Sequence, residues 1–370
     1  MMTTALMATS PAAALELTQI ERRALRADDV AVRVTYCGVC HSDLHSLHTP
    51  VEAGGSFPLV PGHEFVGEVV AVGDDVRSFK PGDPVAVGNI VDSCGTCRMC
   101  RAGQENFCAE FPTLTYSGRD RIDGSVTVGG YSGLYIVRDR FVYHRPTSLD
   151  PAAVAPLMCA GITVWEPLRV AEVGAGTRLG VVGLGGLGHL AVRLGSALGA
   201  DVTVFTTTPA KAADAERLGA AHVVVSTDPA AMRRAAGTLD VIIDTVAVDH
   251  VLAPYLRALD LDGTLFSIGY LGRSPLPRPI SSSGGSGLPP QEAVDADGRR
   301  TCLTSAPSTA SPRTLRCCLR LKSTPRSLVS AGTTSDTASS STLRASMRTR
   351  PCCQMFGSES SVMLEVCRVI

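Results

Sequence analysis

Aromatic side chains, surplus charge and long apolar runs are all scarce in this 370-residue chain. Aromatic residues make up 5% of it and the formal net charge is −1, so neither stacking platforms nor a charged face suggests a nucleic-acid or membrane-surface partner. No apolar stretch reaches the length of a membrane helix. The opening, MMTTALMATSPAAALELTQIERR, lacks the basic region and apolar run of a secretory signal. We therefore expect a cytoplasmic protein without a nucleic-acid or membrane partner.

Cysteine, by contrast, is plentiful, with 13 residues in the chain. In a cytoplasmic protein, clustered cysteines favour metal binding over disulfides. The stretch DSCGTCRMCRAGQENFC contains four of them, and the glycines within it permit the reversals that a loop needs to wrap around one zinc ion. Four thiolates leave no coordination position open, so we predict a structural zinc site at Cys94, Cys97, Cys100 and Cys108.

The length of the chain favours two domains. Residues 1–150 are predicted to form a β-rich, barrel-like, zinc-binding catalytic domain, because alternating runs such as DVAVRVTYCGVC and EFVGEVVAVG are separated by Gly and Pro turns. Near Asp150 the pattern changes to a helix-favouring run, AAVAPLMCAGITVWEPL. Residues 151–275 then alternate strands and helices as in a doubly wound Rossmann nucleotide domain, here incomplete. The predicted fold class is α/β.

The segment 276–370 shows no strand or helix periodicity and is rich in Ser, Thr, Arg, Pro and Cys. It holds 12 Lys and Arg against 6 Asp and Glu, a net charge of +6, so the rest of the chain carries −7. One interpretation is an irregular, low-complexity tail. The other is a reading frame that shifts between Pro275 and Pro279. Taking the third base of each codon with the first two of the next permits LDFCAEHGIAADVEVL over 301–318 and DVRYRFVID over 333–342, a helix-like segment and a strand. We favour the shifted frame and leave the six cysteines of this segment out of the metal count.

A second set of metal-binding side chains is spread along the chain. Cys40 lies in GVCHSDLH, His63 and Glu64 lie in PGHE, and Cys159 lies in MCAG. A catalytic zinc needs three protein ligands and one exchangeable position. Cys40, His63 and Cys159 can supply the three, and Glu64 can take the fourth position when no substrate is present. Each side chain alone is more simply interpreted as a core residue, but their joint occurrence favours a metal site.

Three polar residues that follow Cys40 are predicted to be catalytic. Asp43 can hold the second ring nitrogen of a zinc-bound His63, although it also suits the first turn of a helix. Ser42 has a hydroxyl that can accept the substrate proton, and His45, which titrates near neutrality, can release it to solvent. The alternatives are a serine that caps a helix and an exposed histidine.

The glycines of GLGGLG, at residues 183–188, predict a dinucleotide site. The motif alone is weak evidence, but here it stands between the strand RLGVV and the helix GHLAVRLGSAL. In that context the glycines let the backbone approach a pyrophosphate at the helix N-terminus. The cofactor-binding glycines are Gly183, Gly185, Gly186 and Gly188.

The end of the next strand, VTVFTTTPAK, indicates which nicotinamide cofactor is bound. An NAD site usually places an acid there to bind the ribose hydroxyls. Here Thr206, Thr207 and Thr208 offer hydroxyl donors and Lys211 a cation, which suit a 2′-phosphate. We predict NADP rather than NAD. The alternative is that the threonines only form a polar turn and cap the next helix.

The motifs GVCHSDLH, PGHEFVGEV, the cysteine loop, GGYS, MCAGIT and GLGGLGH occur in one order that resembles the zinc-dependent medium-chain alcohol dehydrogenases. The cinnamyl alcohol dehydrogenase-like branch is the most similar, over residues 15 to 275, and LDFC and DVRYRFVID resemble its ending. The resemblance implies a GroES-like catalytic domain and two zinc ions, one catalytic and one structural. It also implies a relay through Ser42, the cofactor ribose and His45, with Thr163 of MCAGIT at the cofactor.

The same resemblance implies NADP(H)-dependent hydride transfer between primary alcohols and aldehydes, aromatic or cinnamyl-type ones among them, by a homodimer. The alternative function is that of a zinc- and nucleotide-binding remnant with impaired catalysis. In the family the C-terminal stretch adds the last strands of the nucleotide sheet and returns to the catalytic domain, and the segment 276–370 shows no such pattern.

Overall fold

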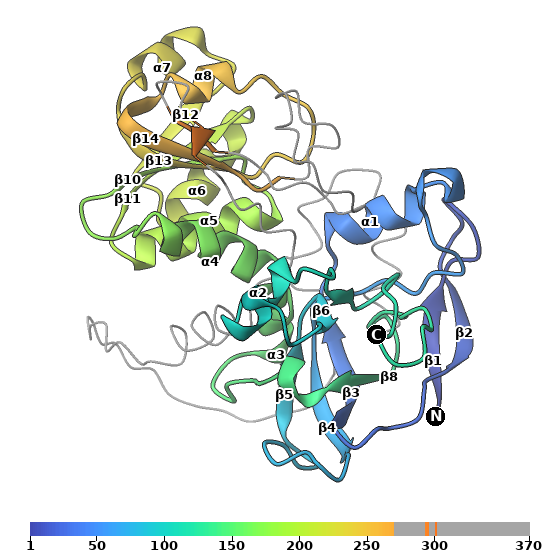
Figure 1. Ribbon diagram of the computed structural model, residues 1–370. Coiled ribbons are helices and arrows are strands. Elements are labelled where there is room, and N and C mark those ends of the chain that lie inside the picture. Colours follow the sequence, from blue (N-terminus) through green and yellow to red (C-terminus); the bar gives the residue numbers. More distant parts are fainter. Residues whose placement is uncertain (270–292, 296–299, 302–370) are drawn as a thin grey trace, which may run out of the picture.

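A five-stranded antiparallel sheet forms the centre of the N-terminal half (Figure 1). The computed structural model describes residues 1–269, 293–295 and 300–301. The strand order is β8-β3-β4-β5-β9, with bounds β3 Asp29–Cys37, β4 Phe65–Val72, β5 Pro84–Val87, β8 Leu134–Arg138 and β9 Val142–His144. Register shifts occur twice in the pairing of β3 with β4. Such bulges bend a sheet, so this one curls into a barrel-like wall.

Both faces of this sheet contribute to hydrophobic cores, because alternate side chains of its strands join different clusters. Val30 and Val32 of β3 pack with Phe65 of β4 in one cluster. Val66 of β4 and Ala86 of β5 point the other way and pack with residues after position 150. The two-residue period of a strand thus places this sheet between its own core and the following helices.

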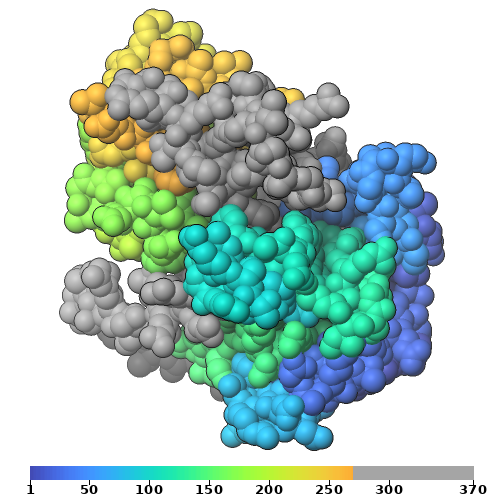
Figure 2. Space-filling view, viewed as in Figure 1, coloured from blue at the N-terminus to red at the C-terminus, as the bar shows by residue number. Residues whose placement is uncertain are grey.

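The remaining N-terminal elements are short and lie around the sheet. Two antiparallel pairs are β1 Met2–Met7 with β2 Glu16–Glu21, and β6 Ile90–Asp92 with β7 Thr113–Leu114. The helical segments are α1 His41–His48, η1 Val51–Ala53, α2 Arg98–Arg101, η2 Glu105–Phe107 and η3 Asp139–Phe141. The lobe between β6 and β7, which contains the four clustered cysteines, is teal in Figure 2 and stands at the surface in that view.

The helix-favouring run after Asp150 forms three segments instead of one helix. They are α3 Pro151–Val154, η4 Ala155–Met158 and α4 Ala160–Val170, and the axis bends by 59° between the second and third. The bend is at Cys159, whose φ of −126° and ψ of −75° are not helical. Within the described residues no single helix is long and apolar enough to cross a membrane, although this bent pair passes by length and composition.

Trp165 of α4, the single tryptophan of the chain, lies where these helices meet the first sheet. It packs with Val66, Tyr143, Met158 and Ile162 and is 6% exposed. Its indole Nε1 has no hydrogen-bond partner among the described residues. The indole thus joins the helices that follow residue 150 to the sheet that precedes it.

The second sheet has the order β12-β11-β10-β13-β14-β15-β16, and its first five strands are parallel. The strands are β10 Arg178–Val182, β11 Asp201–Thr206, β12 His222–Val225, β13 Leu239–Asp244 and β14 Leu259–Ser267. The helices between them are α5 Gly186–Ala197, η5 Pro209–Lys211, α6 Ala212–Leu218, α7 Pro229–Arg234 and α8 Ala253–Leu256. These strands occupy the buried apolar runs that the sequence predicts.

Helices cover both faces of the parallel strands (Figure 1). On one face Val181 and Ile243 pack in a cluster with side chains of α4, α5 and α6. On the other face Val182 and Ile242 pack with side chains from α7 and α8. This alternation is the signature of a doubly wound sheet, which confirms the predicted fold class.

Two short strands continue the sheet beyond β14. β15, Ala293–Asp295, pairs antiparallel with β14, and β16, Arg300–Thr301, pairs antiparallel with β15. These five residues therefore form strands within the segment that the sequence predicts to be irregular. All other residues of 276–370 lie outside the described residues. Of the stretches read in the shifted frame, 301–318 and 333–342, only Thr301 is described.

We predict that Ile242→Ala lowers the free energy of unfolding by about 2–5 kcal/mol, because it leaves a cavity in a fully buried part of the sheet. The matched control is Leu261→Ala in β14, where the side chain is 76% exposed and the change should stay within about 0.5 kcal/mol. Urea unfolding followed by circular dichroism measures both. Equal losses for the two variants would contradict the assigned core.

Candidate active site

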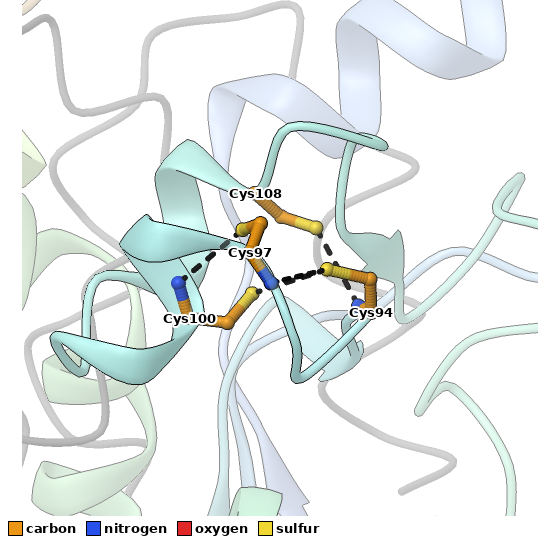
Figure 3. Close-up of side chains that lie close together, drawn as sticks. All are labelled: Cys94, Cys97, Cys100 and Cys108. Carbon is orange, nitrogen blue, oxygen red and sulfur yellow. Dashed lines mark hydrogen bonds between the residues drawn. The ribbon is translucent and has the colours of Figure 1, made fainter.

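The four clustered cysteines converge as the sequence predicts (Figure 3). Their ligand atoms all lie within 4.8 Å of one another. Cys97 is the N-cap of α2, and its sulfur accepts hydrogen bonds from the backbone N–H groups of Cys100 at 3.4 Å and Ala109 at 3.5 Å. The N–H of Cys97 in turn lies 3.3 Å from the sulfur of Cys94 and lowers the pKa of that thiol to about 6. Backbone donors thus favour the thiolate form of Cys94 and Cys97, whereas burial raises the pKa of Cys100 to about 12.

A second group of ligand atoms comes from three separate parts of the chain. Cys40 is the N-cap of α1, His63 precedes β4, and Cys159 stands between η4 and α4. The two sulfurs are 3.8 Å apart, and Nε2 of His63 is 3.2 Å from the Cys159 sulfur. All three ligand atoms lie within 4.8 Å of one another. The structure therefore brings together the three residues predicted to hold a catalytic metal.

Asp43 contacts Nδ1 of His63, the ring nitrogen that does not face the sulfurs, and also caps the start of α1. Its Oδ1 lies 3.1 Å from Nδ1 of His63 and accepts a hydrogen bond from the N–H of Gly62 at 2.9 Å. Its Oδ2 accepts from the N–H of Cys40 at 3.0 Å. Burial opposes the charge on both side chains, but their mutual attraction lowers the pKa of Asp43 and raises that of His63. Both interpretations of Asp43 offered by the sequence are therefore compatible with its contacts.

Glu64 is buried beside this group but does not belong to the set of three ligand atoms. Burial is the main reason why its pKa is raised well above the usual value. Its Oε2 has no hydrogen-bond partner among the described residues. At Gly38 an added Cβ would stand 2.4 Å from Glu64 Oε1, so the side chain occupies space that only glycine leaves free. A buried polar oxygen without a hydrogen-bond partner is costly, which makes Glu64 a candidate for a further metal ligand.

Ser42 and His45 lie one turn apart on α1. The Ser42 hydroxyl is 3.6 Å from the Cys40 sulfur, which places it beside the ligand group. The His45 side chain is exposed, and its pKa is lowered by partial burial and by the neighbouring His41. A relay between the two would need a bridging group, which the resemblance takes to be the cofactor ribose.

The GLGGLG turn has the shape that a pyrophosphate site requires. Gly183 has a φ of +86°, and a Cβ on Gly188 would stand 2.1 Å from the Gly183 carbonyl oxygen. A Cβ on Gly185 or Gly186 would meet nothing within 4 Å. Two glycines thus allow the tight turn and the close packing of α5, and the other two leave open space at the N-terminus of α5.

The threonines after β11 divide into two kinds. Thr206 is buried, and its hydroxyl accepts a hydrogen bond from the N–H of Thr208 at 3.2 Å, which is the turn-forming role of the alternative interpretation. Thr207 and Thr208 are exposed. Nζ of Lys211 is 3.5 Å from the carbonyl oxygen of Leu184, so this cation reaches the glycine-rich turn. Here β11 ends in Thr206 and no acid stands at its end.

Thr163 of α4 is buried, and its hydroxyl has no partner among the described residues. Its N–H donates to the carbonyl of Cys159, one turn earlier.

Tyr131 of GGYS lies near the site, although no role is predicted for it from the sequence. Its hydroxyl lies 3.4 Å from Asp43 Oδ2. The motif GGYS marks the segment, but the contact joins residues 88 positions apart and has no local sequence signal.

Comparisons with known proteins agree with this arrangement. Residues 26–147 match the alcohol dehydrogenase GroES-like domain, and residues 186–285 match the zinc-binding dehydrogenase family. The chain is 45% identical over 264 residues to NADP-dependent alcohol dehydrogenase C 1 of Mycolicibacterium smegmatis, an alignment that covers 71% of this chain and 75% of that protein. It belongs to the zinc-dependent medium-chain alcohol dehydrogenases.

Two solved structures assign this alcohol dehydrogenase to the cinnamyl alcohol dehydrogenase-like branch. Cinnamyl alcohol dehydrogenase SbCAD4 from Sorghum bicolor superimposes with a TM-score of 0.74 at 37% identity, covering 88% of this chain and 90% of its own. The enzyme CAD from Helicobacter pylori, complexed with NADP(H), gives a TM-score of 0.67 at 35% identity, covering 71% and 74%. The predicted family and fold are thereby confirmed, and the relatives support alcohol dehydrogenase activity.

We predict that the purified chain contains about two zinc ions, since the structure holds two separate groups of ligand atoms. Cys97→Ser should lose one zinc and part of the stability, because the loop would lose its closed site. Cys40→Ala should lose the other zinc and the activity while the loop stays intact. Metal analysis by mass spectrometry measures this, and a single equivalent that survives Cys40→Ala would contradict the catalytic metal site.

Proposed function

We propose that this alcohol dehydrogenase interconverts primary alcohols and aldehydes, with aromatic and cinnamyl-type compounds in its range, by hydride exchange with NADP(H). The observation that carries the proposal is the convergence of Cys40, His63 and Cys159 within 4.8 Å, with Asp43 against the outer nitrogen of His63. We assign the catalytic domain to residues 1–150 and the nucleotide domain to 151–275. Oligomeric state, location and the absence of other partners stay predictions.

The residues present fit both groups that the reaction needs. Two cysteines and a histidine form the three-ligand set of a catalytic zinc, and the unpartnered Oε2 of Glu64 offers a further donor nearby. Open space at Gly185 and Gly186 fits a pyrophosphate, and the unpartnered hydroxyl of Thr163 fits a polar cofactor group. When bound, zinc would polarise the substrate oxygen and the nicotinamide would exchange a hydride with the substrate carbon.

The chain's own residues orient the ligands and move the proton. Asp43 fixes which ring nitrogen of His63 faces the two sulfurs, because it occupies the other one. Ser42 accepts the alcohol proton at Oγ, which lies beside the ligand group. His45, one turn further along α1 and exposed, passes the proton to solvent. Reduction of an aldehyde uses the same groups in the opposite direction.

NADP is the proposed cofactor because the end of β11 carries no acid and Lys211 reaches the glycine-rich turn. An acid at that position would repel a 2′-phosphate, whereas a lysine attracts it. Two relatives support the choice, since one is named an NADP-dependent alcohol dehydrogenase and the other was solved with NADP(H). Thr207 and Thr208 are the hydroxyl donors left for the phosphate, because the Thr206 hydroxyl donates to the Thr208 carbonyl at 3.5 Å and accepts from the Thr208 N–H.

A second candidate function is the zinc- and nucleotide-binding remnant with impaired catalysis. The alignment with the mycobacterial relative covers 71% of this chain, which agrees with a segment 276–370 read in a shifted frame. We propose that this segment is out of frame. Activity of the purified chain separates the two functions, and the nucleotide sequence across codons 270 to 285 tests the frame by showing or excluding one inserted or deleted base.

Lys211→Ala is expected to raise the KM for NADP by roughly tenfold or more, because a charge-assisted contact worth about 1.5–3 kcal/mol is lost. The KM for NAD should change little, because NAD has no 2′-phosphate. Lys80→Ala is the matched control, since that lysine is exposed in a turn of the first domain. Steady-state kinetics with both cofactors measure the effect. Equal losses for NADP and NAD would show that Lys211 does not bind the phosphate.

His45→Gln is expected to slow alcohol oxidation by roughly 10²-fold, the lower range for loss of a proton acceptor. The pKa of His45 lies below the ordinary histidine value of about 6.5. The ring is therefore mostly neutral at pH 7 and can accept a proton. In the unaltered chain the acid-side fall of kcat/KM should therefore lie below pH 6.5 and should vanish in His45→Gln.

The control for this pH dependence is His48→Gln on the same helix. The exposed ring of His48 forms a hydrogen bond with the Leu44 carbonyl. This variant should keep both the rate and the pH profile of the unaltered chain. An acid-side fall that persists unchanged in His45→Gln would remove His45 from the relay.

A further inference from the structure

Arg22 is a buried cation whose side-chain acceptors among the described residues are all neutral. Its side chain lies at the end of the β1–β2 pair, just after β2, and the residue is 6% exposed. Four oxygens of one segment, residues 128–134, accept its hydrogen bonds, with distances of 2.6 Å from Nη2 and 2.8 Å from Nε. They belong to Val128, Gly129, Ser132 and Leu134. One side chain thus fixes the whole GGYS segment.

No carboxylate among the described residues forms an ion pair with Arg22. Its guanidinium carbon instead lies 4.6 Å from the centre of the Tyr135 ring. Burial is the main cause that lowers the pKa of Arg22, to about 10, which leaves it charged at neutral pH. A buried charge matched only by carbonyl dipoles and a ring is costly unless its geometry is kept. The acceptors of residues 128–134 are therefore held at fixed positions around it.

The same segment binds the backbone that precedes His63. The N–H groups of residues 129, 130 and 131 donate to the carbonyls of residues 60, 62 and 61 at 2.7, 2.7 and 3.0 Å. The approach is so close that a Cβ on Gly129 would stand 2.1 Å from the Pro61 oxygen. The position of residues 60–62 is therefore set by residues 129–131.

Two contacts connect residues 60–62 and 129–131 to Asp43. The N–H of Gly62 donates to Asp43 Oδ1 at 2.9 Å, and the hydroxyl of Tyr131 lies 3.4 Å from Asp43 Oδ2. Asp43 in turn holds the Nδ1 side of His63. A continuous set of hydrogen-bond contacts thus runs from the guanidinium to His63.

We propose that Arg22 is a positioning residue for the candidate catalytic metal site, acting through residues 128–134 on Asp43 and His63. The inference rests on the proposed assignment of Cys40, His63 and Cys159 as metal ligands. The guanidinium donates from three separate nitrogens in a rigid plane, whereas the three N–H donors of a lysine ammonium share one nitrogen and cannot reach the same spread of acceptors. Loss of Arg22 leaves four acceptors without their donor and frees the segment to move.

A purely structural role for Arg22 is the competing explanation, and the neighbouring residue provides a matched control. Arg23 is also partly buried, but it pairs with Asp29 and Asp120, and its side chain makes no hydrogen bond to residues 128–134, all of which the structure describes. Both Arg22→Met and Arg23→Met remove one guanidinium and lower the melting temperature. Only the first is expected to change the metal site.

The test uses the full chain loaded with Co²⁺, whose visible absorption reports the geometry of its ligands. The band that disappears in Cys40→Ala identifies the site of interest, separate from the tetrathiolate loop. In Arg22→Met this band should shift and its loss to a chelator should be about tenfold faster, in the range measured when outer partners of ligands are changed. In Arg23→Met both the band and the rate should match the unaltered chain.

Arg22→Lys and Tyr131→Phe keep the test decisive if Arg22→Met fails to fold. Arg22→Lys should release Co²⁺ at an intermediate rate, and Tyr131→Phe should shift the band with little change in melting temperature. Arg22 and Arg23 variants with equal spectra and release rates would overturn the positioning role alone. An unaltered chain with no Cys40-dependent band would overturn the proposed metal site together with it.

Discussion

The Asp43 carboxylate is the acceptor on which the candidate active site depends. It is 2% exposed, and a buried carboxylate is stable only if donors surround it. Here the donors are the N–H groups of Cys40 and Gly62 and the ring of His63. Satisfying one charge therefore brings the start of α1 against the segment before β4, so two of the three metal-facing side chains come together before any ion is considered. The third, Cys159, arrives because the helical run after residue 150 breaks there.

Local motifs could be predicted from the sequence because both partners of each contact lie within one short window. The quartet of Cys94 to Cys108 and the turn of Gly183 to Gly188 are of this kind, and their geometry follows from spacing and from glycine alone. The sequence prediction missed the break at Cys159, because AAVAPLMCAGITVWEPL favours a helix by its overall composition, although Pro156 within the run is unfavourable inside a helix. The contacts of Arg22 could not be predicted either. Its acceptors are mostly backbone carbonyls, which every residue has, and they lie more than 100 positions away in the sequence.

The cofactor site shows where residue type was informative and where conformation decided. The absence of an acid after β11 was readable from the sequence, and so was the lysine. The different roles of the three threonines could not be read from the sequence, because they depend on which hydroxyl forms a hydrogen bond with the nearby backbone. In the structure this is the Thr206 hydroxyl, which accepts from the N–H of Thr208. The turn-forming interpretation therefore describes Thr206, while Thr207, Thr208 and Lys211 stay candidates for binding the phosphate.

The position of Trp165 gives the chain a built-in optical probe. All indole emission originates from this one side chain, which packs between strand residues of the first sheet and the helices that lead to the second. Its emission therefore depends on the joint between the two halves rather than on either half alone. An indole whose N–H is buried without a partner emits at short wavelength and shifts to the red when water reaches it. Movement of the nucleotide half against the catalytic half would thus shift the wavelength of this ultraviolet emission, without any attached label.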